Sequence, residues 1–137
     1  MMKVVLDTNV LISAIGIHSP YRIIFDKIKK GELLLAVSTD IINEYREIIS
    51  QKMTSSIADN LTQYLILSPN VLKTNIYYYW SLMNNDESDN KYVDCYIASN
   101  SDFIVTNDKH FEIVKSIDFP KINVINSDDF IDLLNNK

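Results

Sequence analysis

The sequence has 137 residues, of which 47% are hydrophobic and 23% are charged, and it carries a formal net charge of -5. A chain of this length is typical of one domain, so we expect a single domain over residues 1–137. No apolar run approaches the roughly 20 residues of a membrane span, and the first apolar run is too short for a signal peptide. We therefore expect a cytoplasmic protein without a membrane partner. Its single cysteine, Cys95, excludes an intramolecular disulfide and is expected in the core.

The net negative charge argues against general electrostatic binding to nucleic acid, because phosphate-binding surfaces are usually basic. This argument weakens if several of the 18 acidic residues gather around one cation, since the ion reverses the local field.

Short apolar runs alternate with helical patterns along the chain. In chain order the first half predicts a strand at 3–6, helices at 9–16 and 20–30, a strand at 32–37, and helices at 40–52 and 56–67. Pro20 is expected in the first turn of its helix, and Gly31 is expected to end that helix. Ser38, Thr39 and Asp40 are candidate caps for the helix that follows them.

The second half opens with a turn at Pro69 and Asn70 and a stretch without clear periodicity, which contains the aromatic run Tyr77 to Trp80. Core or dimer packing is the favoured interpretation of this run, with base stacking as the alternative. After a polar loop at 84–89, the pattern predicts a helix at 90–100, strands at 103–105 and 122–125, and a helix at 128–135 capped by Ser127.

Strands that alternate with helices predict an α/β domain with a mainly parallel sheet and right-handed crossovers. Such sheets bind ligands beyond the carboxyl ends of their strands. Asp7 and Asp108 each follow a predicted strand, and the helix that carries Glu44 begins at the same edge. This topology therefore brings acids that are distant in sequence to one edge of the sheet.

Each acid has an ordinary explanation as well as a functional one. Asp7 and Asp108 suit helix capping, and Asp89 is either a cap or a ligand. Glu44 lies three residues after Ile41, on the side expected to face the core, where a carboxylate needs a cation unless it reaches solvent or pairs with a lysine.

Asp94 lies in a helix whose neighbouring residues are mostly apolar, with Asn90 one turn earlier as a residue that could orient it. Taken together, the acids suit a hard divalent cation such as Mg²⁺, which prefers oxygen ligands and is often shared with a substrate phosphate. Such an ion polarises a phosphoryl oxygen and lowers the pKa of a bound water, so the pattern indicates phosphodiester hydrolysis.

Four segments together resemble PIN-domain ribonucleases, in the branch of VapC-related toxins of toxin–antitoxin systems. The similarity spans nearly the whole chain, and its ordered motifs are Val4 to Ser13, Glu44 with Tyr45, Asp89 to Cys95, and Asp102 to Phe111. The resemblance implies a three-layer α/β/α fold and Mg²⁺- or Mn²⁺-dependent endoribonuclease activity on RNA. It also implies a homodimer and a cognate antitoxin partner.

Position by position, the resemblance assigns an acidic quartet that is both catalytic and metal-binding, with Asp89 as an additional metal ligand. The quartet is Asp7, Glu44, Asp94 and Asp108. Thr8, Asn9 and Thr106 match the polar residues that support the ligands in the family, and Asn90 joins them from the argument above. The loop before Asn90 lacks the proline that is frequent in the family.

Two other functions remain as alternatives. The first is an inactive PIN scaffold that binds RNA or an antitoxin. The second is a phosphoacceptor or phosphatase with Asp7 as the nucleophile, which is disfavoured because Asn9 stands where a second acid is needed. Lys91 and Lys109 lie beside proposed site acids and are candidates for phosphate contact, although a solvated surface is the favoured explanation for each.

Overall fold

The sheet has five parallel strands and follows the predicted α/β pattern. The structure is a computed structural model that describes residues 1–83 and 87–136, so part of the predicted polar loop lies outside the described residues. The strands are β1 (Lys3–Leu6), β2 (Leu34–Val37), β3 (Val71–Lys73), β4 (Phe103–Val105) and β5 (Val124–Ile125), in the order β3-β2-β1-β4-β5. Every pair is parallel, and β1 lies at the centre.

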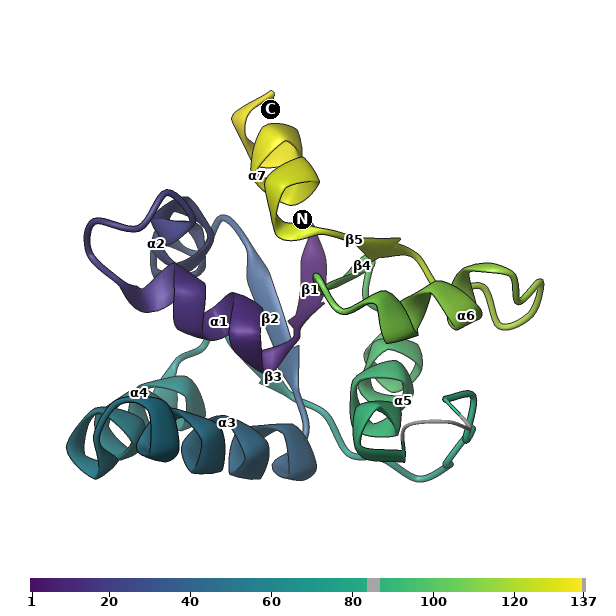
Figure 1. The fold of residues 1–137 in the computed structure, drawn as a ribbon, viewed down its shortest axis with the longest axis horizontal. Coiled ribbons are helices and arrows are strands. Elements are labelled where there is room, and N and C mark those ends of the chain that lie inside the picture. The colour runs from purple at the N-terminus through teal and green to yellow at the C-terminus, as the bar shows by residue number, and fades with distance from the viewer. Residues whose placement is uncertain (84–86, 137) are drawn as a thin grey trace.

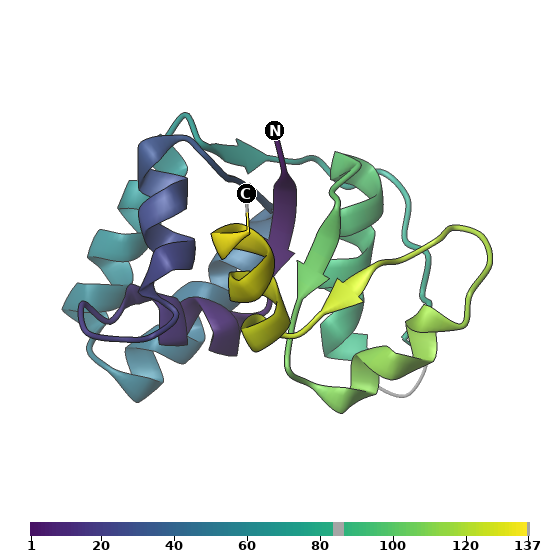
Figure 2. The same ribbon diagram turned by 90° about the horizontal axis from the view of Figure 1, so that it is seen from above.

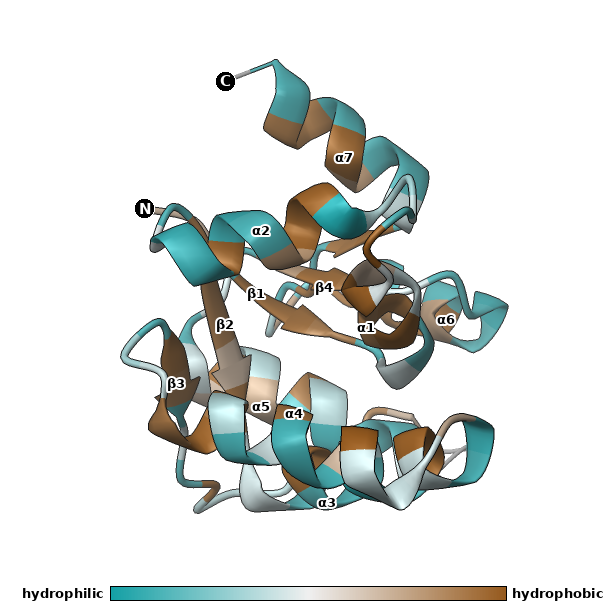
Figure 3. Ribbon diagram, turned by 90° about the vertical axis from the view of Figure 1, so that its left-hand side faces the viewer, coloured by the Kyte–Doolittle hydropathy of each residue, from teal (hydrophilic) through white to brown (hydrophobic). Residues whose placement is uncertain are grey.

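Helices cover both faces of this sheet (Figure 1). One layer contains α1 (Thr8–Ile15), α2 (Arg22–Lys30) and α7 (Ser127–Asn135), and the other contains α3 (Thr39–Lys52), α4 (Ser55–Leu67) and α5 (Asn90–Ser99). Figure 3 shows the two layers edge-on with the sheet between them. The short elements η1 (Glu87–Asp89), η2 (Lys109–Phe111) and α6 (Glu112–Lys115) complete the described chain. The predicted three-layer fold is thus confirmed.

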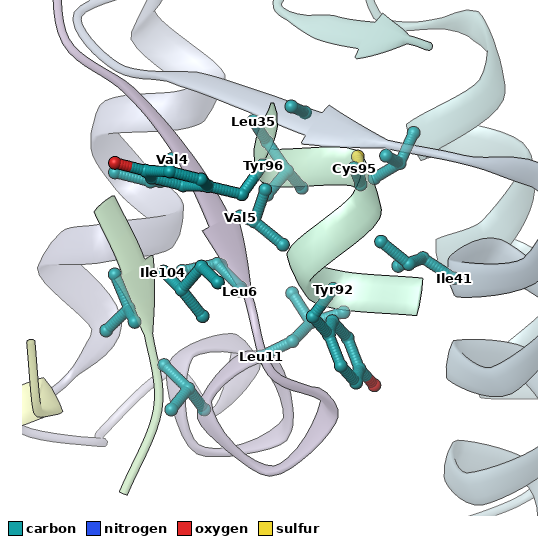
Figure 4. Packing of buried hydrophobic residues seen from close by; sticks show 14 of the residues in the cluster. Val4, Val5, Leu6, Leu11, Leu35, Ile41, Tyr92, Cys95, Tyr96 and Ile104 are labelled. Carbon is teal, nitrogen blue, oxygen red and sulfur yellow. The ribbon is translucent and has the colours of Figure 1, made fainter. Parts of the chain in front are cut away.

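The core is built around β1, because a central strand with helices on both faces has no solvent-facing side. Val4, Val5 and Leu6 are fully buried, and Figure 4 shows them packed among Leu35, Ile104 and aromatic side chains of α5. Cys95 is buried in the same cluster, as expected. Apolar residues thus fix the direction of β1, whose carboxyl end points at Asp7.

Capping and terminating residues explain where α2 ends and α3 begins. Ser38 is the cap of α3, since its side chain accepts a hydrogen bond from the backbone N–H of Ile41. Gly31 ends α2 with φ 77°, in the left-handed region that glycine adopts most easily.

Two predictions about where helices begin were wrong. The cap of α7 is Asn126, which accepts from the N–H of Asp129, and Ser127 is the first helical residue. Pro20 precedes α2 instead of lying in its first turn, because the helix begins at Arg22.

The sequence pattern did not reveal β3. This strand has only three residues, too few for an alternating pattern, and it is recognised by its pairing with β2 from Leu35 to Val37. Its consequence is that residues 74–83 leave the edge of the sheet and run past α5, a path that Figure 2 shows from above. Within the described part of the chain, no helix is long and apolar enough to cross a bilayer.

Candidate metal centre

Asp7 and Asp108 meet at the carboxyl ends of β1 and β4. The register pairs Leu6 with Val105, and the N–H of Asp7 donates to the carbonyl of Val105 at 3.0 Å. Thr106, the next residue after β4, donates its hydroxyl to Asp7 Oδ2 at 2.7 Å and accepts the N–H of Asp108 at 3.1 Å. One buried threonine therefore holds both acidic segments in place.

Asp7 is an acid without a balancing cation in the described part of the chain. It occupies the cap position of α1, yet its side chain makes no capping hydrogen bond. Burial raises the pKa of Asp7, and the nearby charges of Asp108 and Glu44 raise it further, although the hydrogen bonds from the Thr106 hydroxyl and the Thr8 backbone N–H oppose the shift. The capping explanation therefore fails for Asp7, and a bound cation would relieve the electrostatic cost of this site.

Glu44 joins the centre from α3, where helical spacing places it beside the buried residues Ile41 and Tyr45. The hydroxyl of Thr8 donates to Glu44 Oε2 at 2.8 Å, and the hydroxyl of Tyr92 donates to the same oxygen. Thr8 and Tyr92 also contact each other, with 2.6 Å between their hydroxyl oxygens. In Figure 4 the Tyr92 ring packs against the core, and its hydroxyl points away from the buried side chains.

Lys91 pairs with the other oxygen of Glu44, with 2.6 Å between Nζ and Oε1. Burial pushes the pKa of Glu44 upward, but the hydrogen bonds from Lys91, Tyr92 and Thr8 outweigh it, so the pKa lies below its usual value. The solvated-surface interpretation of Lys91 was therefore wrong. In this structure the lysine ammonium is the cation that neutralises Glu44.

Asp89, Asp108 and His110 form a second group of possible metal ligands. One ligand atom from each of the three residues lies within 4.8 Å of the others. Asp89 occupies the cap position of α5 without a side-chain capping bond, so its geometry leaves the ligand interpretation in place. Asp108 Oδ1 accepts the N–H of His110 at 2.9 Å, which is the capping role that the sequence had suggested for it.

Asp94 is not brought to this centre in the described structure. Its Oδ1 accepts the backbone N–H of Trp80 at 3.0 Å, and burial raises its pKa. Asp94 lies two residues after Tyr92, about 200° around the helix, so the two side chains cannot both face Glu44. The sequence argument treated an acid in an apolar helix as a ligand, whereas this carboxylate anchors a neighbouring segment.

Of the four polar residues predicted to support the acids, two contact them and two do not. Thr8 and Thr106 contact the acids, as predicted. Asn9 is exposed and accepts from Lys52 Nζ at 2.8 Å, and Asn90 accepts the N–H of Met83 at 2.8 Å, so neither is hydrogen-bonded to a predicted ligand.

Sequence reasoning missed Tyr92. A hydroxyl at the end of an apolar ring gives no periodic signal, and the one sequence feature beside it is that Tyr92 directly follows Lys91 within the segment from Asp89 to Cys95.

Comparison with known proteins agrees with this geometry. Residues 3–110 match the family model described as PIN domain. The chain belongs to the PIN domain family. The resemblance seen in the sequence is therefore confirmed at the level of the family, and the match includes Asp7, Glu44, Asp89, Asp94 and Asp108.

Solved structures share the fold at low sequence identity. One is the crystal structure of VapBC2 from Rickettsia felis bound to a DNA fragment from their promoter, with a TM-score of 0.60, 20% identity, and coverage of 91% of this chain and 98% of the matched chain. Another is FitAcB from Neisseria gonorrhoeae, with a TM-score of 0.55, 14% identity, and coverage of 90% and 97%. No curated protein sequence matches this chain.

Proposed function

We propose that this PIN domain is a divalent-metal-dependent endoribonuclease, and that Asp7, Asp89 and Asp108 hold Mg²⁺ or Mn²⁺ with Glu44 beside them. The observation that carries the proposal is the convergence of acids at one sheet edge. Asp7 follows β1 and is acted on by the charges of Glu44 and Asp108, and Asp89, at the end of η1, lies beside Asp108. Oxygen donors without a cysteine suit a hard cation. We leave Asp94 outside this set because helical spacing turns it away from the side of α5 that carries Tyr92, and its Oδ1 accepts the Trp80 backbone N–H.

In the proposed hydrolysis, individual residues orient the acids that would hold the ion. A bound divalent ion would polarise the phosphate and lower the pKa of the attacking water. Thr106 orients Asp7 and the Asp108 backbone, while Thr8 and Tyr92 orient Glu44. Burial and the Glu44 hydrogen bond raise the pKa of Tyr92, so it stays protonated and remains a donor to the carboxylate.

We further propose that the protein acts as the toxin of a toxin–antitoxin pair, as a homodimer held inactive by a cognate antitoxin. The support is the shared fold with a chain of the VapBC2 structure, which is a complex bound to DNA from its own promoter. For this chain, the partner is tested by co-purifying the product of the adjacent reading frame.

The nuclease activity is tested with the purified full chain and single-stranded RNA. We expect cleavage with Mg²⁺ or Mn²⁺ and its loss in excess EDTA, with recovery when the ion is restored. RNA binding without cleavage under any of these ions would favour the inactive scaffold. Cleavage that survives EDTA would remove the metal from the mechanism.

A further inference from the structure

A cavity of about 340 Å³ lies where α3 begins, beside the segment that follows β3. Its described lining includes Ser38 and Asp40 at the start of α3 and Asn75, Tyr77 and Tyr79 across from them. Asp40 is the only charged residue in this described lining. The cavity therefore offers hydrogen-bonding groups and aromatic rings but no cation for a phosphate.

The three consecutive tyrosines of this segment have two different environments. Tyr77 and Tyr79 line the cavity and are 88% and 66% exposed. Tyr78 instead packs edge-on against Trp80, with 4.9 Å between the ring centroids. The sequence favoured core or dimer packing for this run; core packing is wrong for these tyrosines, and dimer packing stays a prediction.

The backbone of the aromatic segment is anchored at two points. The N–H of Thr74 donates to the carbonyl of Val37 at 2.7 Å. Further along, Trp80 is held by Asp94. A backbone that is held at both ends loses less freedom when a ligand binds to the segment, which favours binding. Asp94 thus positions this platform.

The cavity lies next to the metal centre. Asp40 precedes Glu44 by four residues on α3, so the two side chains share one flank of the helix, one turn apart. Ser38 directly follows β2, the strand that pairs with β1, and Asp7 directly follows β1. A strand of RNA at the acids would therefore pass close to this cavity.

We propose that the cavity binds one unpaired base of the RNA substrate, and that this base is guanine; the inference rests on the proposed nuclease function. Unpaired bases are commonly stacked on aromatic side chains and hydrogen-bonded along their edges. The N1–H and N2 amino groups of guanine are adjacent donors that match the carboxylate of Asp40. The site selects single-stranded RNA with guanine near the cleaved bond.

The proposal is tested by titrating the metal-free full chain with guanosine and, in parallel, with adenosine, cytidine and uridine, by NMR. We expect saturable shifts with guanosine only. Tyr77→Ala and Tyr79→Ala should each weaken binding about tenfold, the size expected for the loss of one stacking ring. Tyr78→Ala is the matched control and should leave the affinity unchanged. Asp40→Asn should remove the preference for guanosine.

RNA cleavage by the unmodified chain is measured alongside. Cleavage without guanosine binding overturns this inference alone, whereas guanosine binding without cleavage overturns the nuclease proposal and leaves the base site. If Tyr77→Ala changes the oligomeric state but not guanosine binding, the tyrosines form an interface between copies and the base site is rejected.

Discussion

Asp7→Asn should reduce metal-dependent RNA cleavage by at least about 1,000-fold, because the variant loses a carboxylate ligand whose ion contributes several kcal/mol to the transition state. Thr106 can still donate to the oxygen of the new amide, so the local backbone should not move. The measurement is the cleavage rate of single-stranded RNA at saturating Mn²⁺. Asp118→Asn removes the same charge from an exposed site and should cleave normally.

The same variant should make the metal-free fold more stable at neutral pH. Burial raises the folded-state pKa of Asp7, so the folded protein holds this proton more tightly than the unfolded chain does. The ionised carboxylate therefore destabilises the fold above the folded-state pKa, and this cost disappears as the pH falls below the usual value of 3.8. Urea unfolding of both proteins across this range measures the difference. A variant that is less stable at pH 7 would contradict the unbalanced charge of Asp7.

Glu44→Gln should also abolish metal-dependent cleavage, but it should make the metal-free protein less stable. The amide cannot pair with the Lys91 ammonium, which has only 21% of its side chain exposed. We expect a loss of about 1–2 kcal/mol at pH 7, the range for charge-assisted hydrogen bonds that are partly open to solvent. The opposite stability changes at Asp7 and Glu44 distinguish an unbalanced acid from a balanced one.

The stability that Glu44 contributes to the fold should decrease as the pH falls. The folded-state pKa of Glu44 lies below 4.5, so its stabilising contribution is complete above that value and is lost as the pH falls through the lowered pKa. Glu47→Gln, on the exposed side of the same helix, is the matched control and should change neither the cleavage rate nor the stability of the fold. Normal cleavage by Glu44→Gln would remove Glu44 from the site.

The parts of the fold that sequence could predict are those with strong local patterns. Short apolar runs located β1 and β4, and helix patterns located α3 and α5 to within a residue or two. The strand β3 escaped detection because only its pairing with β2 defines it. Sequence therefore predicted the sheet edge at which Asp7 and Asp108 lie.

Which acids meet at that edge is set by side-chain direction, and the linear pattern does not contain this information. Asp94 and Tyr92 are two residues apart on one apolar helix, yet Tyr92 reaches Glu44 and Asp94 reaches the Trp80 backbone. The partner of Asp94 lies in a segment without periodicity, so nothing in the sequence offered a rival to the ligand interpretation. The pairing of Lys91 with Glu44 likewise depends on how α3 and α5 pack together.

The location of a bound Mn²⁺ ion in crystals of the protein tests the central claim most directly. Anomalous diffraction should place the ion about 2.1 Å from carboxylate oxygens of Asp7 and Asp108, with Asp89 and Glu44 around it, as expected for a small hard cation. Asp94 should remain on the N–H of Trp80. An ion coordinated by Asp94, or no ion shared by Asp7 and Asp108 at saturating Mn²⁺, would contradict the proposed metal centre.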